Sequence, residues 1–195
     1  MDKRQFFKTG FMGIGALLVS SKLKALEFYP TSPVKKWAVV YSTWCGSSRD
    51  AGVWISEGMD GIADVFDVRE NPDLSKYENL VIGGSIRSGK VSNQMQEFLA
   101  QNNSALKGRV RGLFAVCGNM MQPVGPEQTK TLIDNHLAKL CDTDNVLSKV
   151  FLGRITYGLM DKDSRQMMEG FDMPEYDNLK RADCMAFGKE ILSNA

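Results

Sequence analysis

Hydroxyl side chains gather in the stretch that follows the first predicted strand, and their chemistry suits anion binding. The strand is the apolar run Trp37–Ser42, and the hydroxyls belong to Ser42, Thr43, Ser47 and Ser48. Where such a loop meets a helix, unpaired amides and the positive end of the helix dipole converge, so a phosphate can bind there without a lysine. Gly46 permits a turn or a close approach that a side chain would obstruct. The segment therefore predicts a phosphate site, and the alternative is a serine-rich helix cap that binds nothing.

Two further loops with unusual side chains are expected at the same edge of the sheet. After Gly83 and Gly84, the third predicted strand runs into Ser85, Ile86, Arg87, Ser88 and Gly89. Glycines let the main chain approach a flat ring, and the Arg87 guanidinium offers a planar cation beside it. The fourth strand ends in Cys117, Gly118, Asn119 and Met120. A polarizable thioether and an amide suit the edge of a heteroaromatic ring, so the three loops together predict a site for a phosphorylated heterocycle.

Short apolar runs alternate with amphipathic stretches along the body of the chain, as in repeated βα units. We expect strands at Trp37–Ser42, Ala63–Val68, Asn79–Ser85, Val110–Cys117 and Lys149–Ile155. We expect helices at Arg49–Met59, Ser92–Gln101, Pro126–Leu140 and Glu175–Leu192. The connection Arg69–Glu78 has room for one helical turn at most. The pattern predicts an α/β fold with a doubly wound, five-stranded parallel sheet in a three-layer αβα arrangement, whose ligand lies beyond the carboxyl ends of the strands.

Composition excludes several classes of function. The chain has 195 residues, 43% of them hydrophobic, and its 24 basic and 23 acidic side chains nearly balance. The basic excess lies within residues 1–27, so the body has no basic field for nucleic acid, and no interior run is long enough to span a membrane. The four cysteines lack Cys-x-x-Cys spacing, and with one histidine a zinc cluster is not expected. We expect Cys45 and Cys117 to be separate thiols.

Residues 1–27 have the organisation of an export leader. Lys3 and Arg4 precede an apolar run from Thr9 to Ser21, which is too short to span a bilayer as a helix. The leader resembles the twin-arginine type, with Lys3 in place of the first arginine and Phe7 in place of a leucine. This resemblance implies passage through the twin-arginine translocon to the periplasm. The alternative is a cytoplasmic protein with a frayed N-terminus or an uncleaved anchor. Residues 28–36 are expected to form a linker to a domain at 37–195.

Two of the loop motifs, taken together, resemble those of one protein family. The first reads Ser42-Thr43-Trp44-Cys45-Gly46-Ser47-Ser48-Arg49, and the second Val81-Ile82-Gly83-Gly84-Ser85-Ile86-Arg87-Ser88-Gly89. They are similar to the flavodoxin-like family, and most similar to its bacterial menaquinone-dependent protoporphyrinogen dehydrogenase branch. That branch continues past its fifth strand into a long basic, apolar insertion, whereas Gly158–Met173 is shorter and mixed in charge. The resemblance covers Trp37 to about Tyr157.

The resemblance implies an FMN protein whose cofactor is held by all three loops. The implied contacts are Ser42, Thr43, Trp44, Cys45, Gly46, Ser47, Ser48, Ser85, Ile86, Arg87, Ser88, Gly89, Cys117, Gly118, Asn119 and Met120. The favoured function is electron transfer in an exported pathway to a redox protein or quinone, with no catalytic side chain. The alternative is an FMN-dependent oxidoreductase acting on a diffusible porphyrinogen or quinone. A third possibility is a flavodoxin-like binding module that has lost its cofactor.

Three side chains, Arg87, Trp44 and His136, have specific expected roles. Arg87 is expected beside the ring, where its charge would raise the potential, or else in an ion pair with Glu97 or Asp161. Trp44 is expected to shield the first loop rather than to stack on the ring. His136 falls on the apolar stripe of its helix, which favours a structural histidine over a catalytic base.

Overall fold

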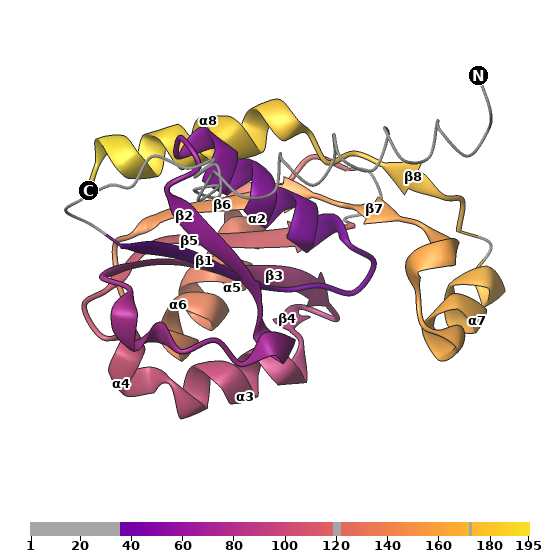
Figure 1. The fold of residues 1–195 in the computed structure, drawn as a ribbon. Coiled ribbons are helices and arrows are strands. Elements are labelled where there is room, and N and C mark those ends of the chain that lie inside the picture. Colours follow the sequence, from indigo (N-terminus) through magenta and orange to yellow (C-terminus); the bar gives the residue numbers. More distant parts are fainter. Residues whose placement is uncertain (1–35, 119–121, 172) are drawn as a thin grey trace, which may run out of the picture. The chain divides into compact units, whose positions relative to one another are not determined.

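The computed structural model describes residues 36–118, 122–171 and 173–195 (Figure 1). Its main sheet has five parallel strands in the spatial order β2-β1-β3-β5-β6. Their bounds are β1 Trp37–Ser42, β2 Ala63–Asp67, β3 Asn79–Arg87, β5 Val110–Cys117 and β6 Leu147–Leu152. A sixth, two-residue strand, β4 (Lys90–Val91), pairs antiparallel with the end of β3. The predicted five-stranded parallel sheet is confirmed. From β1 the chain adds β2 on one side and β3, β5 and β6 on the other, which places the topological switch point between β1 and β3.

Alternate residues of each strand enter two separate cores. Ala38, Val40 and Ile82 belong to one buried cluster, whereas Val39 and Val81 belong to the other. Successive strand residues point to opposite faces, so a sheet covered by helices on both sides needs apolar residues at nearly every position. All six residues of β1 are buried, as this arrangement requires.

Helices α2 (Ser47–Gly58) and α8 (Arg181–Ser193) cover one face of the sheet, as Figure 1 shows. The two helices pack unusually closely. A Cβ on Gly58 would collide with the Met185 carbonyl, and a Cβ on Gly188 would collide with the Ile55 carbonyl. The glycines therefore let the two backbones meet without side chains between them.

The opposite face is covered by α3 (Asn93–Gln101) together with a long interrupted helix. That helix consists of α5 (Pro126–Leu132), the π-helical turn η4 (Ile133–Leu137) and α6 (Ala138–Leu140), and a short helix α4 (Asn103–Leu106) follows α3. The predicted helix Pro126–Leu140 thus exists, but a π turn interrupts it. Between β2 and β3 the chain makes only the single turns η1 (Val68–Glu70) and η2 (Leu74–Lys76).

The predicted last strand and last helix both exist, but their predicted bounds were wrong. The last strand begins two residues earlier than expected and ends at Leu152, and α8 begins at Arg181 rather than at residue 175. The intervening residues 153–178, the closing segment, contain a two-stranded hairpin of β7 (Arg154–Ile155) and β8 (Tyr176–Asp177). They also contain the turn η5 (Tyr157–Leu159) and a helix that was not predicted, α7 (Lys162–Gly170). Its residues are mostly polar, so it lacks a broad apolar face.

No helix in the described part of the chain is long and apolar enough to cross a bilayer. The expected leader at 1–27 and almost all of the expected linker at 28–36 lie outside the described residues.

Candidate functional site

The first loop, residues 43–46, joins β1 to α2 at the carboxyl edge of the sheet. The Thr43 hydroxyl accepts a hydrogen bond of 3.0 Å from the Gly46 amide, which closes the loop. Gly46 has φ of 85°, in the left-handed region that favours glycine. The first helical bond of α2 runs from the Asp50 amide to the Gly46 carbonyl, and no described side chain caps the helix. The amides of residues 47–49 therefore precede that bond and point out of the helix as donors.

Several buried polar atoms have no hydrogen-bond partner, and two of them lie on either side of this loop. Within the described residues they are Ser42 Oγ, Ser48 Oγ, Arg154 Nε and Asn178 Nδ2. Ser42 ends β1 and is 2% exposed, and Ser48 lies in the first turn of α2 and is fully buried. An unpaired buried hydroxyl is costly, so two of them flanking one helix N-terminus indicate that something else supplies their partner.

The guanidinium of Arg154 adds no free positive charge to the first loop. It pairs with Asp50 in the first turn of α2, and also with Asp177 of β8 at 3.3 Å. The Cys45 thiol donates to the Arg154 carbonyl at 3.1 Å. Gly153 lies so close that a Cβ there would be 3.4 Å from Ser47 Oγ. The closing segment thus packs on the first loop, whose donors without a partner are neutral amides and hydroxyls, with Arg154 Nε beside them.

The second part of the site is the β3–β4 hairpin, residues 85–91. Ser88 and Gly89 at its tip have φ of 50° and 77°, as a two-residue type I′ turn requires. A cavity of about 580 Å³ lies between this hairpin, the first loop and the start of α3. Its lining includes Thr43, Trp44, Ser85, Arg87 and Ser88. These five predicted residues are therefore brought together from two loops that are far apart in sequence.

Arg87 and Trp44 form a small network with α7. The Arg87 guanidinium stacks 4.6 Å from the centre of the Trp44 ring and donates to Ser164 Oγ at 3.2 Å. Trp44 Nε1 donates to the same hydroxyl at 3.0 Å and, at 3.3 Å, to Asp161. Ser164 in turn donates to the Asp161 carboxylate at 2.6 Å. These bonds hold the pKa of Asp161 at about 2. Trp44 and Arg87 thus fasten α7 to the carboxyl edge.

The alternative expectation for Arg87, an ion pair with Glu97 or Asp161, is not met among the described residues, because its partners are Trp44, Ser164 and the Met167 sulfur. Gly83 and Gly84 were expected to let the main chain approach a flat ring, but the structure gives them another role. A Cβ on Gly83 would collide with the Phe114 ring, and one on Gly84 with Ser42 Oγ. These glycines make room for neighbouring side chains.

The third predicted loop is described only in part, because Asn119 and Met120 lie outside the described residues. Cys117 is buried at the end of β5, and burial raises the pKa of its thiol to about 11. A Cβ on Gly118 would lie 2.5 Å from the Tyr176 hydroxyl. Tyr176, which the sequence did not indicate, thus occupies the space beside this loop.

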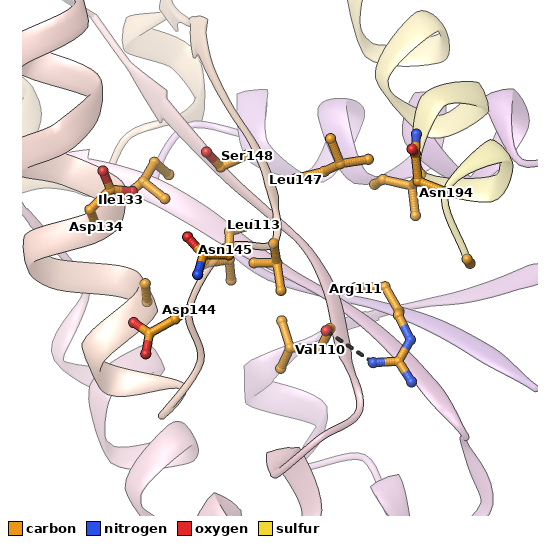
Figure 2. A pocket seen from close by; sticks show the side chains of 14 residues that line it. Val110, Arg111, Leu113, Ile133, Asp134, Asp144, Asn145, Leu147, Ser148 and Asn194 are labelled. Atoms are coloured by element: carbon orange, nitrogen blue, oxygen red, sulfur yellow. Dashed lines mark hydrogen bonds between the residues drawn. The ribbon is translucent and has the colours of Figure 1, made fainter.

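A larger cavity, of about 900 Å³, lies at the opposite edge, where β5 and β6 begin (Figure 2). Arg111, Asp134, Asp144, Asn145 and Asn194 are among its lining residues. The Arg111 guanidinium donates to the Val110 carbonyl in Figure 2 and also to that of Gly108. The four unpaired buried atoms belong to the lining of neither cavity, but Ser42 and Ser48 lie at the carboxyl edge, at the end of β1 and the start of α2. Within the described residues, no group of three His, Cys, Asp or Glu side chains can hold a metal ion.

The family model described as "Flavodoxin domain" matches residues 38–178, which span β1 to the end of the closing segment. The chain belongs to the flavodoxin-domain family. A search of curated proteins gives no match. Solved flavodoxin structures share the fold: oxidised Flavodoxin 1 from Bacillus cereus has 14% identity and a TM-score of 0.52, covering 82% of this chain and 98% of that one.

Two further structures agree with this flavodoxin fold. The flavodoxin of Fusobacterium nucleatum bound to flavin mononucleotide has 13% identity and a TM-score of 0.52, with 82% of this chain and 98% of that chain covered. A flavodoxin, WrbA-like protein from Agrobacterium tumefaciens has 11% identity and a TM-score of 0.53, with 82% and 96% covered. At such identities the likeness concerns the fold.

Proposed function

We propose that this flavodoxin-domain protein binds FMN and transfers electrons in an exported pathway. The observation that carries the proposal is the pair of unpaired, buried hydroxyls of Ser42 and Ser48 at the N-terminus of α2. Membership of the flavodoxin-domain family supports it, as does the binding of flavin mononucleotide by the Fusobacterium nucleatum flavodoxin, which shares the fold.

The residues of the first loop fit a phosphate monoester. The phosphate would accept hydrogen bonds from Ser42, Ser48 and the amides of residues 47–49, and Thr43 retains its hydroxyl proton as a further donor. A dianion at the N-terminus of a helix of 12 residues is also stabilised by the helix dipole. The pairing of Arg154 with Asp50 and Asp177 agrees with a seat that works through neutral donors.

The ring system would lie on the β3–β4 hairpin side of the first loop. The cavity of about 580 Å³ is within the usual range of roughly 300–1,000 Å³ for small-molecule sites. Bound FMN supplies one-electron and two-electron redox chemistry. Ser85 and Ser88 supply polar contacts, and Arg87 supplies positive charge that favours the reduced, anionic state. Trp44 shields the phosphate side from water. We propose that FMN contacts all the residues of the three loops that the sequence motifs imply.

The thiols of Cys117, Cys141 and Cys184 do not suit nucleophilic or redox chemistry of their own. Burial raises the pKa of Cys117 to about 11 and the pKa values of Cys141 and Cys184 to about 12. A thiol with such a pKa stays protonated near neutral pH and is a poor nucleophile. We therefore assign the electron transfer to the cofactor, and the chain binds, orients and tunes it.

The visible spectrum of the purified protein, followed by reconstitution, tests this proposal. We expect a yellow protein that rebinds FMN at least about 100-fold more tightly than riboflavin, because several hydrogen bonds to the charged phosphate are lost with riboflavin. Quenching of flavin fluorescence measures both dissociation constants. A colourless protein that takes up neither compound contradicts the proposal, and equal affinities contradict the phosphate seat.

Export is a separate part of the proposal, supported by the Lys3-Arg4 pair and the apolar run that follows it. Residues 1–35 fused to a folded reporter should carry it to the periplasm through the twin-arginine translocon. Replacing Lys3 and Arg4 together by Gln should keep the reporter in the cytoplasm. Export that persists in this variant, or no export of the original fusion, contradicts this part.

A second candidate is an FMN-dependent oxidoreductase acting on a diffusible quinone or porphyrinogen, as in the protoporphyrinogen dehydrogenase branch. The observation that favours it is the exposure of Leu159, Met167 and Phe171 on the closing segment, with Met167 in contact with Arg87. Apolar side chains beside the ring would suit an apolar substrate. Steady turnover of a soluble quinone or porphyrinogen by the purified protein would establish this candidate, and oxidation only through a redox protein would exclude it.

A further inference from the structure

The single histidine of the chain lies in the π turn η4 and holds the β3–β4 hairpin. Nε2 of His136 accepts a hydrogen bond of 3.0 Å from the backbone amide of Val91, in β4. To accept at Nε2 the neutral ring must carry its proton on Nδ1. The interaction joins the helical layer directly to the hairpin that carries Ser85, Arg87 and Ser88.

Val91 is the point where the hairpin is fastened to the body of the fold. Its side chain is 2% exposed, and its carbonyl accepts from the Gln96 side chain at 3.0 Å. The next residue, Ser92, caps α3 through its hydroxyl. Within the described residues, β4 pairs only with β3, through Ile86 and Arg87. The Val91 amide thus links this two-residue strand to a helix on its other side.

We propose that His136 is a positioning residue that makes the proposed FMN site sensitive to pH. Neutral His136 accepts from Val91 and holds the hairpin against the cavity, whereas protonated His136 has two N–H donors and no acceptor. Protonation adds a proton at Nε2, which sets this N–H group against the Val91 amide. The hydrogen bond between His136 and Val91 is then lost, so the hairpin loosens. The inference rests on the proposed function for its effect on FMN, but not for its effect on the hairpin.

The electrostatic surroundings agree with this direction. Burial lowers the pKa of His136 from 6.5, and the charge of Lys90 on β4 lowers it further. Other charged side chains on the elements around it are exposed: Arg87 on β3, Glu97 on α3, and Glu127, Lys130, Asp134 and Lys139 on its own long helix. The pKa of His136 is therefore lower in the folded protein than in the unfolded chain. The stabilisation of the folded state by the His136–Val91 hydrogen bond is present above about pH 6.5 and is lost as the pH falls through the folded pKa.

The experiment compares the wild-type protein with His136→Gln and His136→Leu. Gln offers a side-chain oxygen acceptor that does not titrate, and Leu offers no acceptor. The dissociation constant for FMN is measured by fluorescence from pH 8 to pH 5. The wild-type affinity should fall about fivefold more than that of His136→Gln over this range, as loss of one net hydrogen bond implies. His136→Leu should bind weakly at every pH.

The FMN phosphate itself titrates near pH 6, and the Gln variant controls for this because its ligand titrates identically. Coincident pH profiles of wild type and His136→Gln would overturn the inference. Matching far-UV circular dichroism spectra of the three proteins establish that each variant is folded.

A second readout needs no cofactor. With only one histidine, its imidazole resonances are unambiguous in NMR spectra, and hydrogen exchange reports the Val91 amide directly. Protection of Val91 should fall in step with ring protonation in the wild type and stay constant in His136→Gln. Protection that does not follow the ring titration overturns the inference. If FMN fails to bind while Val91 still responds, the proposed function fails and the hairpin switch stands.

Discussion

The two edges of the sheet differ in a way that cavity size does not reveal. The amino edge has the larger cavity, about 900 Å³ against about 580 Å³ at the carboxyl edge. The carboxyl edge, however, has the helix N-terminus without a side-chain cap and the buried hydroxyls without partners. At the amino edge the Arg111 guanidinium already donates to two backbone carbonyls. Unsatisfied donors that flank one helix N-terminus indicate a ligand site better than volume does.

This difference has a cause in the fold. In a parallel sheet the strand-to-helix loops and the N-termini of the following helices lie at the carboxyl edge, so donors gather there. The C-termini of the helices, with their carbonyl groups, gather at the other edge. There the Arg111 guanidinium donates to the carbonyl of Gly108, in the turn that follows α4. An anion is therefore favoured at one edge only.

The largest effect on FMN affinity is expected when a hydroxyl is removed at the carboxyl edge. Ser48→Ala should weaken FMN binding by about 10-fold to 100-fold, because a hydrogen bond to a charged group is lost. The stability of the apo protein should stay equal or rise, since the variant removes an unpaired buried group. Fluorescence titration and urea unfolding measure the two quantities.

Ser148→Ala, in the amino-edge cavity, is the matched control and should leave the FMN affinity unchanged. Equal weakening by both serine substitutions would show that the two edges do not differ in the way described above.

A smaller effect is expected from the arginines. Arg87→Ala should lower the two-electron midpoint potential of bound FMN by a few tens of millivolts, because a positive charge near the reduced ring is lost. Arg111→Ala removes the same charge from the other edge and should leave the potential unchanged. Redox titration of the two variants beside the wild type gives the comparison. An unchanged potential in Arg87→Ala means that the stacking on Trp44 keeps its charge away from the ring.

The smallest effect concerns the attachment of α7. The pKa of Asp161 is lowered from 3.8 to about 2, so the carboxylate stabilises this attachment above about pH 3.8 and ceases to do so as the pH falls through 2. Acidification from pH 4 to pH 2 should release Trp44 from Asp161 and Ser164 and shift its fluorescence. Asp161→Ala should show the shifted emission already at pH 7. Trp44→Phe identifies the signal, because Trp37 and Trp54 remain; a shift that persists in Trp44→Phe would contradict the assignment.

The sheet could be predicted from the sequence because its central strands, β1, β3 and β5, are buried on both faces. Runs such as Val39-Val40 and Leu80-Val81-Ile82 leave no polar face, and their spacing with amphipathic helices is typical of a doubly wound fold. The first loop was predictable for a similar reason, since its hydroxyls and Gly46 are adjacent in sequence. Local patterns suffice where the neighbours in space are neighbours in the chain.

The closing segment could not be predicted because its contacts are distant in sequence. Its helix α7 is fastened through Ser164 to Trp44 and Arg87, which lie 120 and 77 residues away. The start of α8 was missed because Tyr176 and Asp177 pair with β7, which ends an apparently helical pattern. An Asp-x-x-Ser pattern at Asp161 and Ser164, typical of a helix start, was the available signal for α7.

The direct backbone contact between α2 and α8 makes the position of the first loop depend on α8, which is distant in the chain. Because Gly58 and Gly188 let carbonyls of one helix lie directly against the other, a methyl group added there must push the helices apart. The start of α2 provides the amides of the first loop, so such a displacement would tilt the donors away from their anion. Gly188→Ala would then act as a remote lesion, impairing cofactor retention without altering any group that the cofactor touches.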